Sequence, residues 1–233
     1  MNLQLRALGM KCTDLFYSTD LAGILNQEEK ELLSTNSTMI TYSKGDCLVK
    51  KGEFVTDAIY ICSGFIKVHL DFERKNMILS VSGNKKFLLL GTMIFKDIQP
   101  FNLTAIEETI VCLTDIKIIR EIVLKNPKLS GYILKNLNES MLYYVHHNLV
   151  SLTQNNIHGR LAHVILYLAE EVFQSNSFDI LLSRKELSEL CNISRENVIK
   201  VLYEFDRDGI IQLQGKNIYI NSLDSLRKIA NHG

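Results

Sequence analysis

Apolar and polar residues follow two different rhythms along the chain, and the change lies near residue 120. Before it, short apolar or β-branched runs are separated by Gly, Asn and Asp, which is typical of strands joined by tight turns. The run 65–70 alternates cleanly, with Ile66, Val68 and Leu70 on one side. We predict strands at the following ranges: 39–42, 47–49, 58–62, 65–70, 76–81, 87–90, 102–113 and 116–119. Many short strands predict a sandwich or barrel.

After residue 120, apolar residues recur every three or four positions, which predicts helices. Between 128 and 152 the spacing resembles a coiled-coil seam. The members of this seam are Leu134, Leu137, Met141, Tyr144, Asn148 and Leu152. Only Lys128, Lys135 and Glu139 are charged in the segment, so its polar face is thin. We expect the β-domain to cover one side of the helix and a second copy of the helix to cover the other. A helix buried within a monomer is the alternative.

The pattern near the C-terminus predicts two short helices joined by a tight turn. Ser183 and Glu186 have the spacing of a capping box, and Asn192 can take the left-handed conformation that such a turn needs. Ser194 is a good N-cap for the second helix. The buried stripe of that helix is expected to be Val198, Val201, Leu202 and Phe205. A hairpin over 210–220 follows, so the whole segment predicts a winged helix-turn-helix.

The outer face of the second helix carries the side-chain types that read DNA bases. Arg and Lys can donate to guanine O6 and N7, and Glu can accept from cytosine N4. Hydroxyls, helix N-termini and a lysine on the wing can hold phosphates. The DNA contacts that we predict are Ser183, Arg184, Lys185, Ser194, Arg195, Glu196, Ile199, Lys200 and Lys216. A winged helix used only for protein contacts is the alternative.

Composition limits the class of protein without naming a function. The chain has 233 residues, of which 46% are hydrophobic and 22% charged, and its formal net charge is +0. These values exclude collagen-like, disulfide-rich and disordered classes. The zero charge by itself argues against a polyanion partner, and residues 155–233 carry 9 basic and 10 acidic side chains. DNA affinity must then come from a few well-placed cations, which predicts weak non-specific binding and a shallow salt dependence.

Cysteine usage and the chain's first residues indicate a cytoplasmic protein. No two of the five cysteines are closer than 15 residues, a spacing that fits neither a metal site nor a disulfide framework. We expect buried, reduced thiols. The first residues lack the apolar region of a signal peptide, and no apolar run approaches the length of a membrane span. We therefore expect no membrane partner.

Segment 182–211, LSRKELSELCNISRENVIKVLYEFDRDGII, resembles the helix-turn-helix of the Crp/Fnr superfamily of bacterial transcription regulators. Residues 44–53 and 58–70 are similar to the glycine-punctuated strands of that family's cyclic-nucleotide-binding-type β-roll. Residues 155–171 resemble the start of its DNA-binding domain. The resemblance implies an α+β fold of three parts: a jelly-roll-like sensor domain over 1–125, a dimerisation helix over 126–153 and a winged helix-turn-helix DNA-binding domain over 154–233.

The resemblance implies a homodimer that binds a two-fold symmetric DNA operator, contacts RNA polymerase and regulates transcription. It implies base contacts from Arg195, Glu196 and Lys200. Lys200 replaces a more usual Arg and loses the bidentate fork of the guanidinium. A ligand-carrier or dimerisation protein with a vestigial DNA-binding domain is the alternative function. An enzyme is not expected, because His69, Asp71 and Glu73 on one strand have no second His-rich strand to complete a site.

The expected sensor pocket departs from the family's cyclic-AMP site. Members that bind cyclic AMP hold its phosphate with an Arg and its ribose with a Glu, and the matching positions here are Leu103 and Leu90. An apolar pocket cannot pair a buried phosphate, so we predict no binding of cyclic AMP or cyclic GMP. The pocket residues that we predict are Leu88, Leu89, Leu90, Leu103 and Thr104.

No cofactor is expected in the sensor domain. An iron–sulfur cluster needs about four closely spaced thiolates, whereas Cys12 stands alone near the N-terminus. Haem is an alternative, with His69, His146 and His147 as the candidate axial ligands. Redox sensing through Cys47, Cys62 or Cys112 is another. An unidentified apolar ligand, or none, is the expectation that we carry forward.

Overall fold

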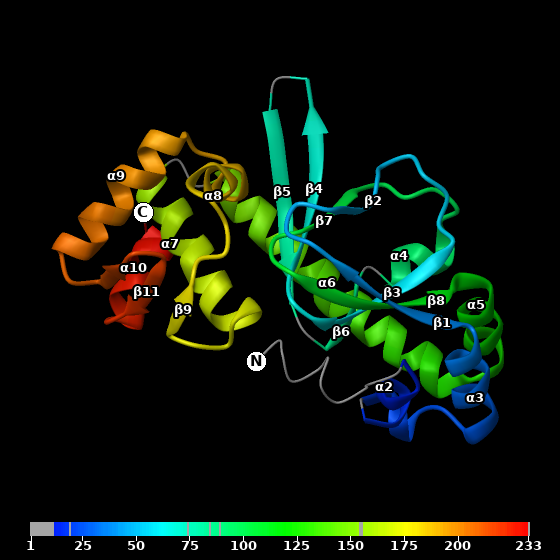
Figure 1. The fold of residues 1–233 in the computed structure, drawn as a ribbon. Coiled ribbons are helices and arrows are strands. Elements are labelled where there is room, and N and C mark those ends of the chain that lie inside the picture. Colours follow the sequence, from blue (N-terminus) through cyan, green and yellow to red (C-terminus); the bar gives the residue numbers. More distant parts are fainter. Residues whose placement is uncertain are drawn as a thin grey trace. The chain divides into compact units, whose positions relative to one another are not determined.

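The computed structural model describes residues 12–18, 20–73, 75–83, 85–88, 90–153 and 156–232 (Figure 1). The chain divides into two compact units. The first unit is Met1–Ile66 with Ser82–Met141, and the second is Lys67–Val81 with Leu142–Gly233. Within the described ranges, no helix is long and apolar enough to cross a membrane.

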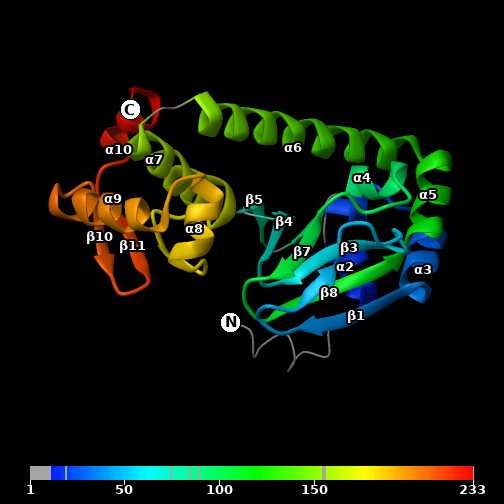
Figure 2. The same ribbon diagram turned by 90° about the horizontal axis from the view of Figure 1, so that it is seen from above.

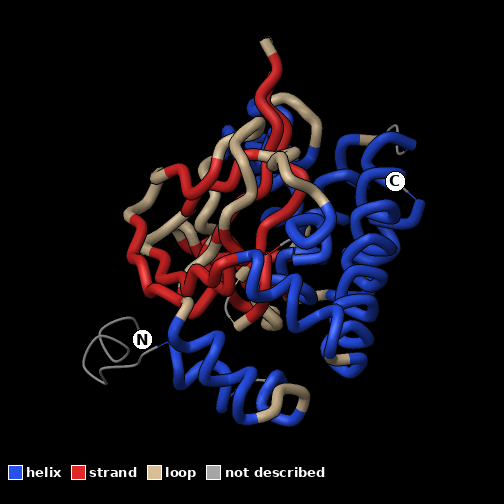
Figure 3. The backbone as a smooth tube through the Cα atoms, turned by 90° about the vertical axis from the view of Figure 1, so that its right-hand side faces the viewer, coloured by secondary structure: helices blue, strands red, loops and turns tan. Residues whose placement is uncertain are grey.

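Two four-stranded sheets, red in Figure 3, account for the strand-like pattern before residue 120. Their strands are β1 (Ser37–Tyr42), β2 (Cys47–Val49), β3 (Asp57–Ser63), β4 (Ile66–Phe72), β5 (Lys75–Ser82), β6 (Lys86–Leu88), β7 (Asn102–Ala105) and β8 (Thr109–Asp115). One sheet has the order β1-β8-β3-β6 and the other β2-β7-β4-β5. The predicted α+β fold with an N-terminal β-domain of short strands is thus confirmed.

The predicted strand over 116–119 is wrong, because these residues open helix α5 (Ile116–Lys125). Asp115 caps this helix, and its carboxylate accepts a 2.8 Å hydrogen bond from the backbone amide of Lys117. Ile116 and Ile119 are buried with Ile122, which is a helical spacing. Helix packing therefore overrides the β-propensity of an isoleucine-rich run.

Two further predicted strands have different bounds in the structure. The predicted strand over 102–113 is two strands, β7 and β8, separated by a turn. The predicted strand over 87–90 is β6, which ends at Leu88, and helix α4 (Leu90–Phe95) starts two residues later.

Gly64, which follows β3, shows why a glycine ends this strand. Its φ is +94°, in the region that favours glycine. A Cβ built there would lie 2.7 Å from the backbone oxygen of Glu108 and from the Cα of Thr109. Since both atoms belong to the main chain, the close approach of the two segments requires glycine.

The first unit also contains three N-terminal helical elements that the sequence pattern did not predict. They are α2 (Cys12–Ser18), the 3₁₀ helix η1 (Asp20–Gly23) and α3 (Gln27–Thr35). Asn26 caps α3 by accepting from the amide of Glu29, whose carboxylate in turn accepts from the Asn26 amide, both at 2.9 Å. The apolar residues Leu15, Phe16 and Leu33 are buried, so these helices extend the core of the unit.

The long helix predicted over 128–152 is α6 (Pro127–Thr153), which Figure 2 shows as one continuous rod. Leu129 and Ile133 are buried in the first unit. Beyond them an apolar face is uncovered: Leu134, Met141, Leu142 and Val145 are all exposed. Of the other predicted seam residues, Leu137 is half-buried, and the side chains of Tyr144, Asn148 and Leu152 lie outside the described part.

The second unit contains the winged helix-turn-helix. Its elements are α7 (Ile157–Tyr167), the π-helical turn η2 (Leu168–Val172), β9 (Ser177–Asp179), α8 (Arg184–Cys191), α9 (Arg195–Arg207), β10 (Ile211–Gln214), β11 (Asn217–Ile220) and α10 (Leu223–His232). The wing is a three-stranded sheet of order β10-β11-β9. Residues Lys67–Val81 join this unit, and the Tyr167 hydroxyl donates to the Val81 oxygen and accepts from the Val81 amide, each at 2.8 Å.

Candidate nucleic-acid interface

The first helix of the motif, α8, begins with the capping box that the sequence predicts. Glu186 accepts from the Ser183 amide at 2.8 Å, and Ser183 Oγ accepts from the Glu186 amide at 3.2 Å. Lys67 Nζ lies 2.6 Å from Glu186 Oε1. Burial favours a raised pKa for Glu186, but the hydrogen bonds from Lys67 and Ser183 outweigh it and hold the pKa below its ordinary value.

The turn between the two helices depends on Asn192. This residue has φ 55° and ψ 40°, the predicted left-handed conformation. Its carbonyl oxygen accepts a 3.0 Å hydrogen bond from Arg160 of α7, and its side-chain oxygen accepts from Lys75. The turn is therefore held from two sides as well as by its own backbone preference.

The second helix, α9, has one buried face and one exposed face. Ser194 caps it by accepting from the Asn197 amide at 3.2 Å, as predicted. Each residue of the predicted inner stripe is at most 2% exposed: Val198, Val201, Leu202 and Phe205. Burying these side chains fixes the rotation of α9, and so decides which residues face solvent.

The exposed face of α9 presents the predicted base-reading groups together. Arg195, Glu196 and Lys200 are exposed, and Ile199 is half-buried between them. The Glu196 backbone amide and the Ser194 hydroxyl hold the pKa of the Glu196 carboxyl below its ordinary value. At neutral pH the face therefore offers two cations and one carboxylate acceptor, the groups that guanine and cytosine edges require.

The predicted phosphate contacts are distributed around this face. Ser183 and Lys185 are exposed at the start of α8, where Lys185 pairs loosely with Glu189 at 3.8 Å. Arg184 is half-buried, and this burial lowers the pKa of its guanidinium. The ordinary pKa of arginine is so high that the group remains charged. Lys216 is exposed in the tight turn of the wing, next to Gly215 at φ +63°.

Two residues of α9 that were not assigned a DNA-contact role also bear on the interface. Tyr203 is 66% exposed, one turn beyond Lys200. Glu204 lies 3.9 Å from Lys200 Nζ and 2.7 Å from His158 Nε2. The four-residue spacing of Lys200 and Glu204 is a signal for the first contact, but no sequence signal identifies His158, which comes from α7.

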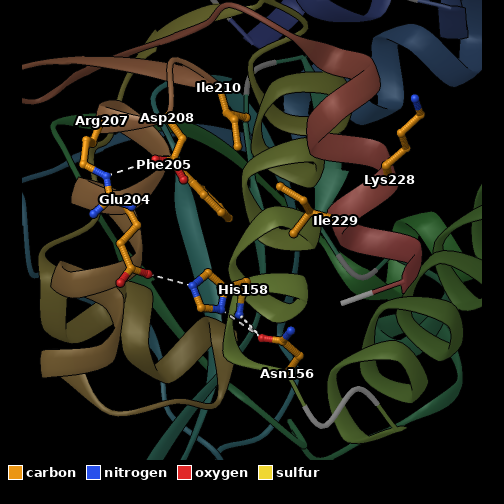
Figure 4. A pocket seen from close by; sticks show the side chains of 9 residues that line it. All are labelled: Asn156, His158, Glu204, Phe205, Arg207, Asp208, Ile210, Lys228 and Ile229. Atoms are coloured by element: carbon orange, nitrogen blue, oxygen red, sulfur yellow. Dashed lines mark hydrogen bonds and ion pairs between the residues drawn. The ribbon is translucent and has the colours of Figure 1, made fainter.

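Glu204 and His158 also line a groove at the far end of α9 (Figure 4). The groove has a volume of about 740 Å³, and it is lined by Asn156, His158, Glu204, Phe205, Arg207, Asp208, Ile210, Lys228 and Ile229. His158 contacts Asn156 Oδ1 through its other ring nitrogen at 3.0 Å. The groove thus lies at the opposite end of α9 from Arg195 and Glu196.

Comparison with known proteins bears on this geometry. Residues 159–229 match the model of the Crp-like helix-turn-helix domain. The chain is 27% identical over 195 residues to the anaerobic regulatory protein of Haemophilus influenzae, covering 78% of this chain and 72% of that protein. It is 26% identical over 200 residues to the CRP-like cAMP-activated global transcriptional regulator of Mycobacterium tuberculosis, covering 82% and 87%. The structure of FixK2 from Bradyrhizobium japonicum superposes with a TM-score of 0.77 at 14% identity, covering 83% of this chain and 96% of that one.

Residues 159–229 are therefore a Crp-like helix-turn-helix domain. With this DNA-binding domain the chain is a transcription regulator of the Crp/Fnr type, and the relatives that it resembles are regulators rather than enzymes. The two relatives named above carry different descriptions, one anaerobic and one cAMP-activated, so this likeness does not identify a signal for the chain.

The residues predicted to line an effector pocket are buried or half-buried where the structure describes them. Leu88 and Leu103 are at most 1% exposed, and Thr104 is half-buried. Leu89 and the side chain of Leu90 lie outside the described part. Of the candidate haem ligands, His69 contacts Asp71 at 2.9 Å, whereas the side chains of His146 and His147 also lie outside it.

The cysteines of the regulator do not all match the expectation of buried thiols. Cys12, Cys62, Cys112 and Cys191 are buried and reduced, but Cys47 is exposed at the start of β2. Cys47 lies on β2, the edge strand of its sheet, where Leu48 and Val49 are half-buried. Within the described ranges, no three His, Cys, Asp or Glu side chains form a group that could hold a metal ion.

Proposed function

We propose that this regulator acts as a homodimer and reads a two-fold symmetric DNA operator through α9. The observation that carries the proposal is the exposed face of α9, where Arg195, Glu196 and Lys200 stand opposite a fully buried stripe. Donors and an acceptor at the N-terminal end of an exposed helix suit the edges of bases in the major groove. The cations at Lys185 and Lys216 would position the phosphates on either side.

The uncovered apolar face of α6 supports the second copy. Leu134 is 62% exposed, Met141 60% and Leu142 63%, with Val145 close to them along the helix. Contiguous exposed apolar side chains mark interaction surfaces, and their spacing suits pairing with the same helix of another chain. A two-fold dimer of this kind would present its two recognition helices about 34 Å apart, one turn of DNA.

We propose that the expected sensor pocket does not bind cyclic AMP or cyclic GMP. Leu103 is fully buried at the position where cyclic-AMP-binding members carry an Arg, and Leu88 is buried beside the expected site. A phosphate there would lose its hydration without gaining a cation. The ligand, if the pocket takes one, would be a small apolar molecule, with no haem and no iron–sulfur cluster.

RNA polymerase is the proposed protein partner, because regulators of this kind act on transcription once bound at a promoter. Because its DNA partner is chromosomal, the cytoplasm is the compartment in which we propose that the protein works. A ligand carrier with a vestigial DNA-binding domain would need neither partner, and the next experiment separates the two functions.

The test begins with a double-stranded DNA site selected by binding from a random pool. Its affinity is then measured by fluorescence anisotropy for the wild type, for Arg195→Ala/Lys200→Ala, and for Lys228→Ala as a charge control on α10. Because each good base contact is worth about 1–3 kcal/mol, we expect the double variant to lose about 100-fold or more, and the control to lose little. Equal affinities for the wild type and the double variant would refute the DNA-reading role of α9.

The homodimer is tested separately by light scattering during gel filtration. We expect a dimer for the wild type and a monomer for Leu134→Asp/Met141→Asp, with Leu124→Asp as a control because Leu124 is also exposed but lies on α5. A monomeric wild type would refute the proposed homodimer, but it would not affect the test of DNA binding by α9. Isothermal titration with cyclic AMP should show no heat of binding, and a saturable heat would contradict the proposed pocket.

A further inference from the structure

The hairpin of β4 and β5 contacts the first helix of the motif at both of its ends. Lys67 of β4 lies 2.6 Å from the carboxylate of Glu186, in the first turn of α8. Lys75, the first residue of β5, donates to the side-chain oxygen of Asn192, the residue that caps the end of α8. Residues 67–81 and all of α8 belong to the second unit. One hairpin within this unit therefore holds α8 at its start and at the turn that follows it.

The side of β4 that carries Lys67 is covered, although its residues are polar. Ile66 and Val68 are at most 1% exposed, so Lys67 and His69 lie on the opposite side of the strand from these core residues. The side chains of Lys67 and His69 are only 16% and 13% exposed, and that of Glu186 is 20% exposed. A lysine is seldom buried to this degree unless it is paired, and Glu186 supplies the paired charge.

Lys67 neutralises a carboxylate that lies among the predicted phosphate contacts. Glu186 Oε2 accepts from the amide and the hydroxyl of Ser183, each at 2.8 Å, while Oε1 accepts from Lys67. Ser183 and Lys185 are at the same start of α8, where we expect them to hold DNA phosphates. A carboxylate without a cation there would repel those phosphates, and the Lys67 ammonium cancels its charge.

Lys75 acts on the turn from which α9 starts. Asn192 is in the left-handed conformation, and its carbonyl oxygen accepts from Arg160 of α7 at 3.0 Å. With Lys75 on its side-chain oxygen, Asn192 is bonded from β5 as well as from α7. Ser194, the N-cap of α9, is only two residues further along the chain. The two bonds to Asn192 therefore restrict the direction in which α9 leaves the turn.

The hairpin is itself fixed within the second unit. In the sheet order β2-β7-β4-β5, β5 is an edge strand, whose outer backbone groups need partners from elsewhere. The Tyr167 hydroxyl of α7 bonds both the amide and the oxygen of Val81, each at 2.8 Å and buried. A hairpin anchored at Val81 can hold α8 in one place, because its own backbone is held.

We propose that Lys67 and Lys75 are positioning residues for DNA binding, which act through Glu186 and Asn192 to hold α8 and the start of α9 in the orientation that meets DNA. This inference rests on the proposed reading of DNA by α9, and it adds two residues from outside the helix-turn-helix. In this role neither lysine touches DNA. Neither therefore contributes to the counterion release that makes DNA binding depend on salt.

The test uses the full-length protein and the DNA site selected from the random pool. Lys67→Met retains most of the side-chain stem and removes the charge, so we expect affinity to fall about 10-fold, an effect typical of a lost hydrogen bond between charged groups. Lys67→Arg should restore the affinity, since a guanidinium can bind the same carboxylate. Lys125→Met is the matched control, because Lys125 pairs with Glu121 at the same 2.6 Å but on α5.

Two comparisons distinguish positioning from direct contact with DNA. The loss caused by Lys67→Met should disappear in a protein that already carries Glu186→Gln, because Lys67 acts through that carboxylate. Lys75→Met should weaken binding and leave the slope of log affinity against log salt unchanged. A slope reduced by about 1 for each subunit would make Lys75 a phosphate contact and refute its positioning role. If the wild type binds DNA and Lys67→Met binds equally well, the inference fails while the reading by α9 is retained; a wild type that binds no DNA refutes both.

A measurement on the wild type tests the contact without any variant. A water-soluble carbodiimide joins a lysine amine to a carboxylate that it touches, and digestion with mass spectrometry identifies the joined peptides. We expect a pair joined through Lys67 and Glu186, both in the free protein and with the selected DNA bound. A crosslink that forms only without DNA would show that the hairpin leaves α8 on binding, and would overturn the proposal. Absence of the crosslink in both states would overturn it as well.

Discussion

Glu204 Oε2 lies 2.7 Å from His158 Nε2, so a carboxylate of the recognition helix α9 is held against the first turn of α7. The same carboxylate reaches Lys200 at 3.9 Å. Glu204 thus connects a predicted base-reading lysine to the body of the domain. Glu204 therefore belongs both to the contact between α9 and α7 and to the exposed side of α9 that carries Lys200.

Replacing Glu204 with Gln should separate these two roles. Both partners are partly exposed, so we expect the free energy of unfolding, measured in urea, to fall by no more than about 1 kcal/mol. DNA affinity should stay the same or increase, because Lys200 loses a competing carboxylate. Glu170→Gln, which removes the exposed pair with Arg227, is the matched control for stability. A large loss of DNA affinity in Glu204→Gln would show that this carboxylate itself contacts DNA.

The capping box of α8 predicts a second stability effect. Ser183→Ala removes the acceptor for the Glu186 amide, and losing an N-cap of this kind costs about 1 kcal/mol. Ser183→Thr retains a hydroxyl and should cost less. Both values can be measured by denaturant unfolding of the full chain. Equal losses for Ala and Thr would mean that the hydroxyl does not cap the helix.

The acid stability of the protein should depend on Glu186. Its folded-state pKa lies below its ordinary value, so the folded state favours the ionised carboxylate. That stabilisation is present at pH values above the ordinary pKa, and it is lost as the pH falls through the folded-state pKa. Unfolding measured between pH 7 and pH 3 should therefore show a smaller acid-induced loss for Glu186→Gln than for the wild type. Parallel pH profiles for the two proteins would contradict this assignment.

Charge removal should distinguish base contacts from phosphate contacts. For the selected DNA site, Lys216→Ala should weaken binding to all sequences alike and reduce the slope of log affinity against log salt by about 1 for each subunit of the proposed dimer. Arg195→Ala should instead reduce discrimination at one base pair of each half-site by about 1–3 kcal/mol. Anisotropy titrations on the selected site and on single-base variants measure both effects. The assignment fails if Lys216→Ala changes sequence preference while Arg195→Ala does not.

Much of the DNA-binding unit could be predicted because its signals are local. Ser183, Asn192 and Ser194 act within a few residues along the chain, so the sequence alone predicts the two caps and the turn, and the structure confirms them. The inner stripe of α9 follows from helical periodicity alone. The contact of Glu204 with His158 could not be found in this way, since it depends on how α7 packs beside α9.

The β-domain is less predictable because its elements are short and because some of its segments suit a strand by composition but form a helix. The isoleucine-rich segment 116–119 suits a strand by composition, yet Asp115 caps a helix there and Ile116, Ile119 and Ile122 share its buried side. The exposed position of Cys47 likewise depends on the pairing of β2 with β7, two strands that are far apart in the sequence.

The close approach at Gly64 limits how this protein can vary. Every amino acid that a single base change can reach from a glycine codon carries a Cβ, and main-chain atoms of Glu108 and Thr109 occupy the space that a Cβ needs. Selection for folded protein from a library randomised at this codon should thus return glycine almost alone. At Gly45, where φ is +91° but the space is open, Asn should be tolerated at a cost in stability. We therefore expect glycine at position 64 to be retained, because no single amino-acid change there preserves the fold.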